Sequence, residues 1–384
     1  MQTEERLANM QARMEETGVD LAAVGPTANM RYLLGFVPHA DERPCILLVD
    51  RQSVRMVVPG LNREEVAAHT GIDLIAWADA DGPQEALRQA LAALPKPSTL
   101  AVDGAMRADH LLQLQALVTP DRTMTVDELL TPLRMCKSAE EIDALARAAA
   151  QADRVMQVAV NACRPGATEA EVAWATEAAF RQDGAEEVCF TLIASGFNGA
   201  YPHHHSGTRR LQQGDAIVID IGASLNGYKS DITRMVYLGE PRVEFLRAYA
   251  AVYEANQRAM AAVRPGLLAG EIDHIARNTL EAAGYGPLFI HRTGHGIGLE
   301  VHEPPWIMAG DTTVLREGMV FSIEPGVYLV GQFGVRIEDI VLATQSGVRS
   351  LTGFDHSLVI KDSNTGGNNG QAYCDLQSAT GGRS

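Results

Sequence analysis

Two stretches of the chain repeat one frame: LQQGDAIVIDIG at 211–222 and LREGMVFSIEPG at 315–326. In each copy a Gly precedes an apolar run, and the run leads to an acidic residue, Asp220 or Glu324. A second acidic segment follows each copy, DITR at 231–234 and EDIV at 338–341. Arg-Pro-Gly also occurs twice, at 164–166 and 264–266, each time between two helix patterns. The repeat predicts an α+β domain built from two related halves, each with two carboxylates on neighbouring strands.

Four carboxylates at the junction of such halves require cations or shared protons. Neighbouring strands lie ~5 Å apart, and two like charges at 4 Å cost about 4 kcal/mol even at an effective dielectric near 20. Asp220 and Glu324 follow apolar runs, where an unpaired charge is costly, so isolated solvated acids are a weak explanation. Two divalent ions would neutralise the cluster formed with Asp231 and Glu338. Such a pair can activate a bridging water for amide hydrolysis.

One histidine is placed to complete the cluster. His295 lies in the glycine-rich segment GHGIG at 294–298, between the two repeats, with His291 and His302 on either side. A single His in such a segment is more often structural, but this position favours a metal ligand. Carboxylates with one imidazole suit Mn, Co, Fe or Zn.

The first ~130 residues read as a separate α/β unit because strand and helix patterns alternate. Helices are expected over 3–17 and 84–94, and strands over 21–24, 45–49, 54–58 and 100–102. Ser138 and Glu141 form a capping-box pattern ahead of a long helix that ends near Ala162. We therefore expect an N-terminal domain over 1–132 and a second domain over 133–360. Residues 361–384, which include Cys374, are expected to form a mobile polar tail without a role in chemistry.

Composition excludes several classes of partner. The net charge of −16 disfavours nucleic acid and anionic membranes. No apolar run is long enough to span a bilayer, and the N-terminus lacks a signal-peptide core. The five cysteines are widely spaced and odd in number, which favours a reducing compartment. These features predict a cytoplasmic protein.

The order of these motifs resembles the pita-bread metallopeptidases, a group with methionine aminopeptidase, aminopeptidase P, prolidase and creatinase. The matching motifs are D-x10-D, GHG-x-G, I-E-P-G and V-R-I-E-D, over about 138–360. YLLGF at 32–36 and ERP at 42–44 resemble the N-terminal domain that aminopeptidase P, prolidase and creatinase carry. The resemblance implies a pita-bread catalytic domain with a pseudo-twofold repeat, preceded by a smaller creatinase-like α/β domain. It also implies a homodimer.

The resemblance also implies site residues. The metals would be two divalent ions, with Mn expected and Co or Zn as alternatives. Asp231 and Glu338 would bridge both ions, Asp220 would bind one, and His295 and Glu324 the other. Glu324 would also shuttle a proton. The resemblance also places His203 and His291 beside the substrate, His302 beside the developing oxyanion and Arg336 beside a ligand carboxylate that it braces. Independently of the resemblance, an Xaa-Pro amide has no N–H to donate, so an apolar pocket for the proline ring is expected. Its candidates are Phe190, Tyr201 and Trp306, with ordinary core packing as the alternative for Phe190. His204 and His205 are expected in a solvated loop.

These residues predict a dinuclear Xaa-Pro aminopeptidase that acts on proline-containing peptides through a metal-bridging hydroxide. Prolidase-like sequences often carry an arginine four residues after the histidine matching His302. Here Trp306 stands at that place, and no Lys or Arg occurs over 303–315. This difference favours longer peptides over dipeptides. An arginine from elsewhere, such as Arg43 with His39 from a partner subunit, would restore the alternative of an Xaa-Pro dipeptidase. A small-molecule hydrolase or lyase on the same scaffold, or a non-catalytic binding module, are further alternatives.

Overall fold

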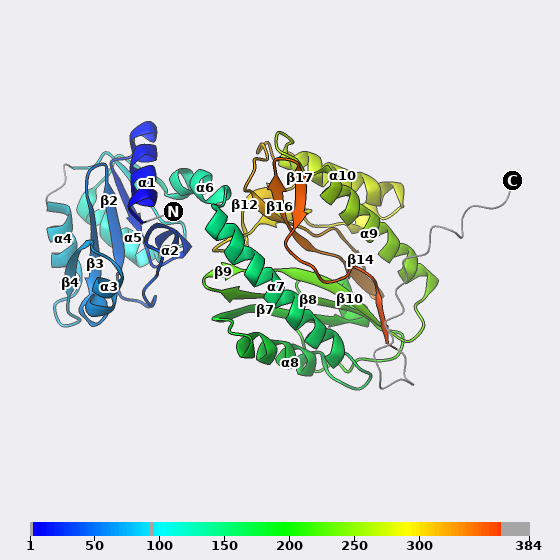
Figure 1. Ribbon diagram of the computed structural model, residues 1–384. Helices are drawn as coiled ribbons and strands as arrows, with labels where there is room; N and C mark the ends of the chain where they lie inside the picture. The colour runs from blue at the N-terminus through cyan, green and yellow to red at the C-terminus, as the bar shows by residue number, and fades with distance from the viewer. Residues whose placement is uncertain (1–2, 93–95, 362–384) are drawn as a thin grey trace. The chain divides into compact units, whose positions relative to one another are not determined.

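The computed structural model describes residues 3–92 and 96–361. The chain forms two compact units, Met1–Arg134 and Met135–Ser384 (Figure 1). The predicted tail lies outside the described residues except for Lys361, which ends a strand and donates hydrogen bonds to the carbonyls of Val160 and Asn161. Within the described part of the chain, no helix combines the length and apolar character that crossing a membrane requires.

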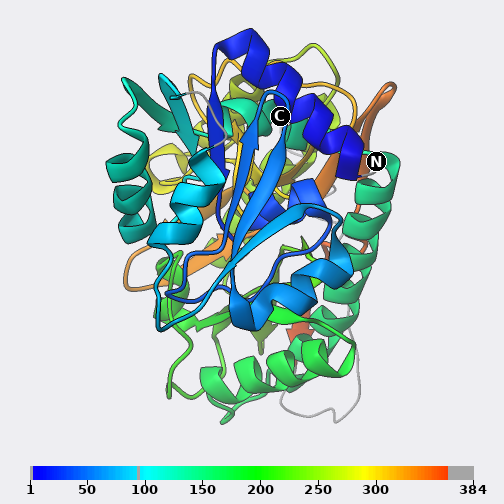
Figure 2. The same ribbon diagram turned by 90° about the vertical axis from the view of Figure 1, so that its left-hand side faces the viewer.

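The N-terminal unit is a mixed six-stranded sheet with strand order β4-β3-β2-β1-β5-β6. Figure 2 brings this unit to the front. The strands are β1 (Leu21–Val24), β2 (Ile46–Asp50), β3 (Val54–Pro59), β4 (Asp73–Trp77), β5 (Thr99–Val102) and β6 (Arg122–Thr125). The helices are α1 (Thr3–Thr17), α2 (Ala28–Leu34), α3 (Arg63–His69), α4 (Gln84–Ala92), α5 (Ala108–Val118) and α6 (Asp127–Met135). The expected elements all form, with bounds that differ by a residue or two. Residues 93 and 94 of the second expected helix lie outside the described residues.

The C-terminal unit contains two halves, and each half begins with two helices that are followed by strands. Its first half comprises α7 (Ala139–Ala162), α8 (Glu169–Gln182), β7 (Glu187–Ser195), β8 (Ala216–Leu225), β9 (Tyr228–Lys229) and β10 (Ile232–Leu238). Its second half comprises α9 (Val243–Ala262), α10 (Ala269–Ala282), β11 (Gly294–Gly296), β12 (Glu303–Ile307), β13 (Val320–Ile323), β14 (Gly326–Leu329), β15 (Phe333–Arg336), β16 (Asp339–Thr344), β17 (Gly347–Ser350) and β18 (Val359–Lys361). One sheet runs β18-β10-β8-β7 with β9 on β8, a second runs β12-β11-β13-β16-β17, and β14 pairs with β15 in a two-stranded sheet.

The repeated Arg-Pro-Gly segments make the same turn in both halves. Gly166 and Gly266 have φ of 87° and 90°, a left-handed conformation that Gly adopts without steric cost. The N–H of Gly166 donates to the carbonyl of Leu211 at 2.8 Å, and that of Gly266 donates to Leu315 at the same distance. Both acceptors are the first residues of the repeated frames. Each turn therefore ties its helix pair to the strand that carries an acidic residue.

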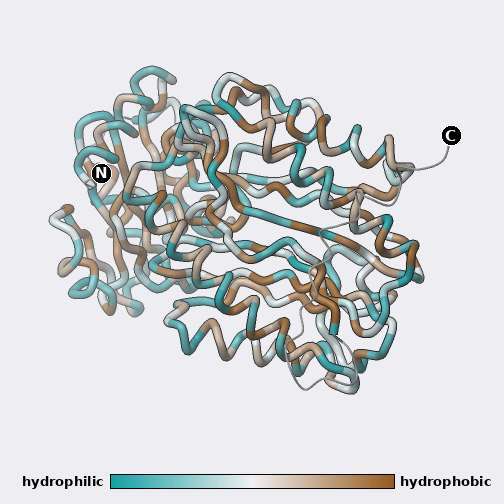
Figure 3. Tube along the Cα trace, turned by 45° about the vertical axis from the view of Figure 1, so that its right-hand side comes forward, coloured by the Kyte–Doolittle hydropathy of each residue, from teal (hydrophilic) through white to brown (hydrophobic). Residues whose placement is uncertain are grey.

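The alternation of side chains along β8 decides which way Asp220 points. Ile217, Ile219 and Ile221 pack into a cluster with α7 and α8, and each buried side chain of this size contributes about 1.5–3 kcal/mol. Ala216 and Val218 face the opposite side and pack with residues of the second half. Since successive residues of a strand alternate faces, Asp220 also points away from α7 and α8. Figure 3 shows hydrophobic and hydrophilic residues alternating along the helices, as expected for helices that pack by one face.

Candidate metal centre and active site

Four strand positions bring the carboxylates together. In the antiparallel pair β8–β10, Asp220 lies opposite Thr233, and Asp231 immediately precedes β10. In the pair β13–β16, Ile323 lies opposite Asp339, so Glu324 directly follows β13 and Glu338 directly precedes β16. The apolar run before Asp220 does not end the strand, and Asp220 lies inside β8, which continues to Leu225.

His295 enters from the middle of β11, which pairs with β13 through Gly296 and Phe321. Its Nε2 lies 3.2 Å from Glu324 Oε1 and 3.7 Å from Asp231 Oδ2. Its Nδ1 lies 3.1 Å from the carbonyl of Gly296. A carbonyl only accepts, so Nδ1 carries the proton and donates, which leaves the Nε2 lone pair directed at the carboxylates. Gly294 permits this approach, since a Cβ there would lie 1.9 Å from the carbonyl oxygen of Ser322.

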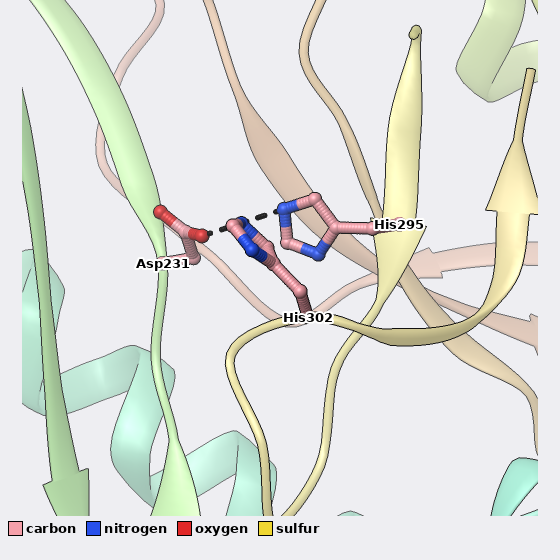
Figure 4. Close-up of side chains that lie close together, drawn as sticks. All are labelled: Asp231, His295 and His302. Atoms are coloured by element: carbon pink, nitrogen blue, oxygen red, sulfur yellow. Dashed lines mark ion pairs between the residues drawn. The ribbon is translucent and has the colours of Figure 1, made fainter. Parts of the chain in front are cut away.

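Three overlapping groups of donor atoms could hold metal ions, with the ligand atoms of each group within 4.8 Å of one another. The groups are Asp220–Asp231–Glu338, His295–Glu324–Glu338 and Asp231–His295–His302. Glu338 is common to the first two groups, which together use all five predicted ligands. Figure 4 shows His295 and His302 approaching Asp231. The overlap fits two neighbouring ions that share a carboxylate.

The electrostatics of the five residues also fit bound cations. Burial raises the pKa of Asp231 and Glu338 well above the ordinary range, and the neighbouring carboxylates raise it further. For Glu324, burial acts in the same direction, but the neighbouring His295, His291 and Arg336 outweigh it and lower the pKa to about 2. Two buried oxygens, Asp220 Oδ1 and Glu338 Oε1, have no hydrogen-bond partner among the described residues. Unpartnered buried carboxylate oxygens are costly, and metal coordination would satisfy both.

Arg336, at the end of β15, braces the cluster from one side. Its guanidinium donates to Asp220 Oδ2 at 2.5 Å, to Thr233 Oγ1 at 3.1 Å and to the Tyr328 hydroxyl at 2.8 Å. Thr233 in turn donates to Glu338 Oε2 at 2.7 Å. One arginine thus holds carboxylates of both halves in place, directly or through Thr233.

A cavity of about 960 Å³ opens onto the cluster. It is lined by the five carboxylate and histidine residues of the cluster and by His203, His204, His205, His291, His302, Phe190, Arg292 and Arg336, among others. His302 stacks edge-on against His295, with ring centroids 4.2 Å apart. Burial, followed by the neighbouring His295 and Arg292, lowers the pKa of His302 to about 4. His302 is therefore a neutral hydrogen-bonding group at pH 7.

Other predicted side chains lie outside the cavity or are committed to other contacts. Tyr201 is 51% exposed, and neither it nor Trp306 is among the described residues that line the cavity. His291 is held between the Arg292 carbonyl (Nδ1, 2.7 Å) and the Tyr328 hydroxyl (Nε2, 2.8 Å). Burial lowers the pKa of His291.

Sequence reasoning missed three participants: Thr233, Tyr328 and the partner of His204. His204 does not belong to a freely solvated loop, because its Nε2 lies 2.8 Å from Oε2 of the buried Glu169. No pattern marks Tyr328 or Glu169, because each acquires its role through tertiary contacts. Thr233 offered a signal, since it stands two residues after Asp231 and so faces the same side of the strand.

Comparisons with known proteins agree with this geometry. Residues 143–345 match metallopeptidase family M24, and residues 6–136 match the creatinase/prolidase N-terminal domain. The chain is 38% identical over 361 residues to a probable dipeptidase PepE of Mycobacterium tuberculosis, covering 92% of this chain and 96% of that protein. It is 35% identical over 356 residues to an Xaa-Pro dipeptidase of Pyrococcus furiosus, covering 92% and 99%. The crystal structure of dipeptidase PepE from Mycobacterium ulcerans superposes with a TM-score of 0.87 at 39% identity, covering 94% and 98%.

These matches confirm the predicted fold class, a pita-bread catalytic domain preceded by a creatinase-like domain. They also confirm that the chain is a peptidase. The relatives' names favour the dipeptidase alternative over the aminopeptidase that the sequence analysis placed first. By family match and by identity along nearly its whole length, the chain belongs to metallopeptidase family M24.

Proposed function

We propose that this chain is an Xaa-Pro dipeptidase that uses two divalent metal ions to hydrolyse the bond before a C-terminal proline. The observation that supports the metal site is the cluster of Asp220, Asp231, His295, Glu324 and Glu338, in which two buried oxygens find no hydrogen-bond partner among the residues that the structure describes. The observation that supports the substrate is the similarity, at 35–38% identity, to proteins named dipeptidase and Xaa-Pro dipeptidase. When bound, the metal ions would activate water and polarise the scissile carbonyl.

The chain's own residues supply the remaining steps. Glu324 lies at the edge of the cluster, beside His295, where its carboxylate can accept a proton from water and return it to the leaving proline nitrogen. His302, neutral and exposed on the cavity side of His295, can donate a hydrogen bond to the oxygen of the scissile carbonyl as negative charge develops. Arg336 and Thr233 keep the carboxylates oriented.

An Xaa-Pro bond suits a cavity with an apolar side. Its tertiary amide nitrogen has no N–H to donate, so recognition of the ring depends on apolar contact. Phe190, Leu192 and Val301 line the cavity that holds the cluster. Which metal is used, whether the chain forms a homodimer and whether it is cytoplasmic stay predictions from the sequence.

The test compares initial rates on Met-Pro, Met-Pro-Ala and Met-Ala, with Mn, Co and Zn added separately to metal-free protein. We expect Met-Pro to be cleaved fastest and Met-Ala slowest. Preferential cleavage of Met-Pro-Ala would restore the aminopeptidase interpretation. Failure to cleave any of the three peptides with any metal would refute a peptidase of this specificity and favour a small-molecule hydrolase or lyase.

A further inference from the structure

The cavity beside the metal cluster holds a guanidinium to which no described residue offers a hydrogen-bond acceptor or an ion-pair partner. Among the residues that the structure describes, two arginines line this cavity, Arg292 and Arg336. Arg336 is committed to Asp220, Thr233 and Tyr328. In the described parts of the chain, no hydrogen bond or ion pair involves the guanidinium of Arg292. A half-buried cation without a partner is costly, so its donors are available for an anionic group of a ligand.

The Arg292 side chain is nevertheless held in one place. Its guanidinium carbon lies 4.5 Å from the centroid of the Trp306 ring, in a cation–π contact. Trp306 lies directly opposite His295 in the antiparallel pair β11–β12, so its ring stands on the same face as the metal-cluster histidine. A rigid platform of this kind restrains a side chain that would otherwise lose about 2 kcal/mol of rotamer entropy on ligand binding. The guanidinium of Arg292, stacked on Trp306, is thus preorganised beside the metal cluster.

We propose that Arg292, stacked on Trp306, binds the free carboxylate of the C-terminal proline of an Xaa-Pro dipeptide. This inference rests on the proposed function and names the residue that would set its specificity. The planar guanidinium matches a carboxylate with two parallel hydrogen bonds. Three bonds of about 1.3–1.5 Å join the scissile carbonyl carbon to the proline carboxylate carbon. The group that binds this carboxylate must therefore share a cavity with the metal cluster, as Arg292 does.

The arginine that the sequence analysis offered for this role is occupied within its own unit. Arg43 donates to both carboxylate oxygens of Asp79, at 2.9 and 3.0 Å, and to Asp41 at 2.8 Å. In a longer peptide the proline carboxylate becomes an amide, and the terminal carboxylate moves about 3.8 Å further per added residue. Arg292 would then lose its charge-assisted contact. The same residue therefore accounts for a preference for dipeptides over longer peptides.

The experiment measures kcat and KM for Met-Pro and for its C-terminal amide with metal-loaded wild type, Arg292→Gln, Arg292→Lys and Arg247→Gln. Arg247 is exposed on α9 and serves as the matched control for loss of one positive charge. For Met-Pro we expect Arg292→Gln to raise KM by about 10- to 100-fold, with a smaller effect for Arg292→Lys. For the amide, KM should be the same in every variant. Equal KM values for Met-Pro in wild type and Arg292→Gln, or an equal rise for both substrates, would overturn the inference.

A binding measurement separates this inference from the proposed function. Calorimetry with L-proline and L-prolinamide needs no turnover. Wild type should bind proline more tightly than prolinamide, and Arg292→Gln should lose this preference. If wild type cleaves no Xaa-Pro peptide but shows the preference and the variant loses it, the function fails and the carboxylate site stands. If Arg292→Gln keeps the preference, the site is wrong whatever the activity.

Discussion

Replacing Glu169 by Gln tests the buried network that holds the loop carrying His203. Glu169 is the first residue of α8 and is fully buried. Its carboxylate accepts hydrogen bonds from the Ser195 N–H and hydroxyl at 2.8 and 2.7 Å, from Asn198 Nδ2 at 2.9 Å and from the Gly207 N–H at 3.2 Å. His204 Nε2 lies at 2.8 Å. The carboxylate therefore ties both ends of the segment around His203 to one helix.

The expected magnitude follows from these contacts. A Gln amide has one acceptor oxygen and would direct its NH2 group at donors such as the Ser195 N–H. Breaking a buried charged arrangement from one side costs about 3–5 kcal/mol. For a unit of this size, each kcal/mol shifts the melting temperature by roughly 2–4 °C. Glu169→Gln should therefore lower the melting temperature of the C-terminal unit by roughly 6–20 °C in calorimetry.

Glu171→Gln is the matched control because it makes the same chemical change two residues along the same helix. Glu171 accepts from the Thr168 N–H in an exposed capping box, and Gln serves there as well. Glu171→Gln should change the free energy of unfolding by no more than about 0.5 kcal/mol. A melting temperature for Glu169→Gln within 1 °C of this control would refute the reasoning.

The effect of acid gives a second criterion. Burial acts to raise the pKa of Glu169, but its hydrogen bonds from Ser195, Asn198 and His204 outweigh burial and lower it. A group with a lowered folded-state pKa contributes stability above its unfolded pKa of about 4.3. That contribution is lost as the pH falls through the lower folded-state value. The stability difference between wild type and Glu169→Gln should be constant from about pH 8 to pH 5 and should shrink below about pH 4. A difference that does not shrink in acid would contradict a role for the ionised carboxylate.

Three further predictions address the metal cluster. Metal-free Glu338→Gln should be more stable than metal-free wild type, because one of four repelling carboxylates is lost. Mn, Co or Zn should stabilise only the wild type, by about 2.7 kcal/mol when the metal is present at 100 times its Kd. Equal metal-induced shifts of the melting temperature in the two proteins would contradict this. His302→Ala should lower kcat by about 10²–10³-fold with metal content unchanged by elemental analysis, and a wild-type kcat would exclude an oxyanion role. Gly294→Ala should lower the free energy of unfolding in urea by about 3 kcal/mol or more, since its Cβ would lie 1.9 Å from the Ser322 carbonyl oxygen. Gly71→Ala serves as the control, because a Cβ there meets nothing within 4 Å. Equal stabilities of the two variants would refute the close approach at Gly294.

The repeat made much of the C-terminal fold predictable because its two copies carry the same physical constraints. A left-handed Gly, an apolar strand and an acidic residue recur in order, and two occurrences reduce the chance that either is accidental. The bounds of β8 were less predictable. Its residues are buried on both faces, so the apolar run lacks the alternation that would have placed Asp220 within the strand.

The network around Glu169 could not be predicted, for a different reason. Its members lie at the start of α8, at the end of β7 and in the loop after it. In the sequence, Glu169 reads as an ordinary acidic residue in the first turn of a helix, where the helix dipole already favours it. Only the tertiary contact with Ser195 and His204 distinguishes it from its exposed neighbour Glu171.

The preference for longer peptides, drawn from the sequence, shows how such an argument depends on strand register. That preference rested on the absence of Lys and Arg over 303–315, the segment around Trp306. In the structure, β12 pairs with β11, and Trp306 lies opposite His295. Arg292, three residues before His295, consequently stacks on the Trp306 ring although it precedes that residue by 14 positions. A side chain just before one strand can thus place its charge over a residue of the neighbouring strand. The absence of a cation from one segment therefore carries little weight until the pairing of that segment is known.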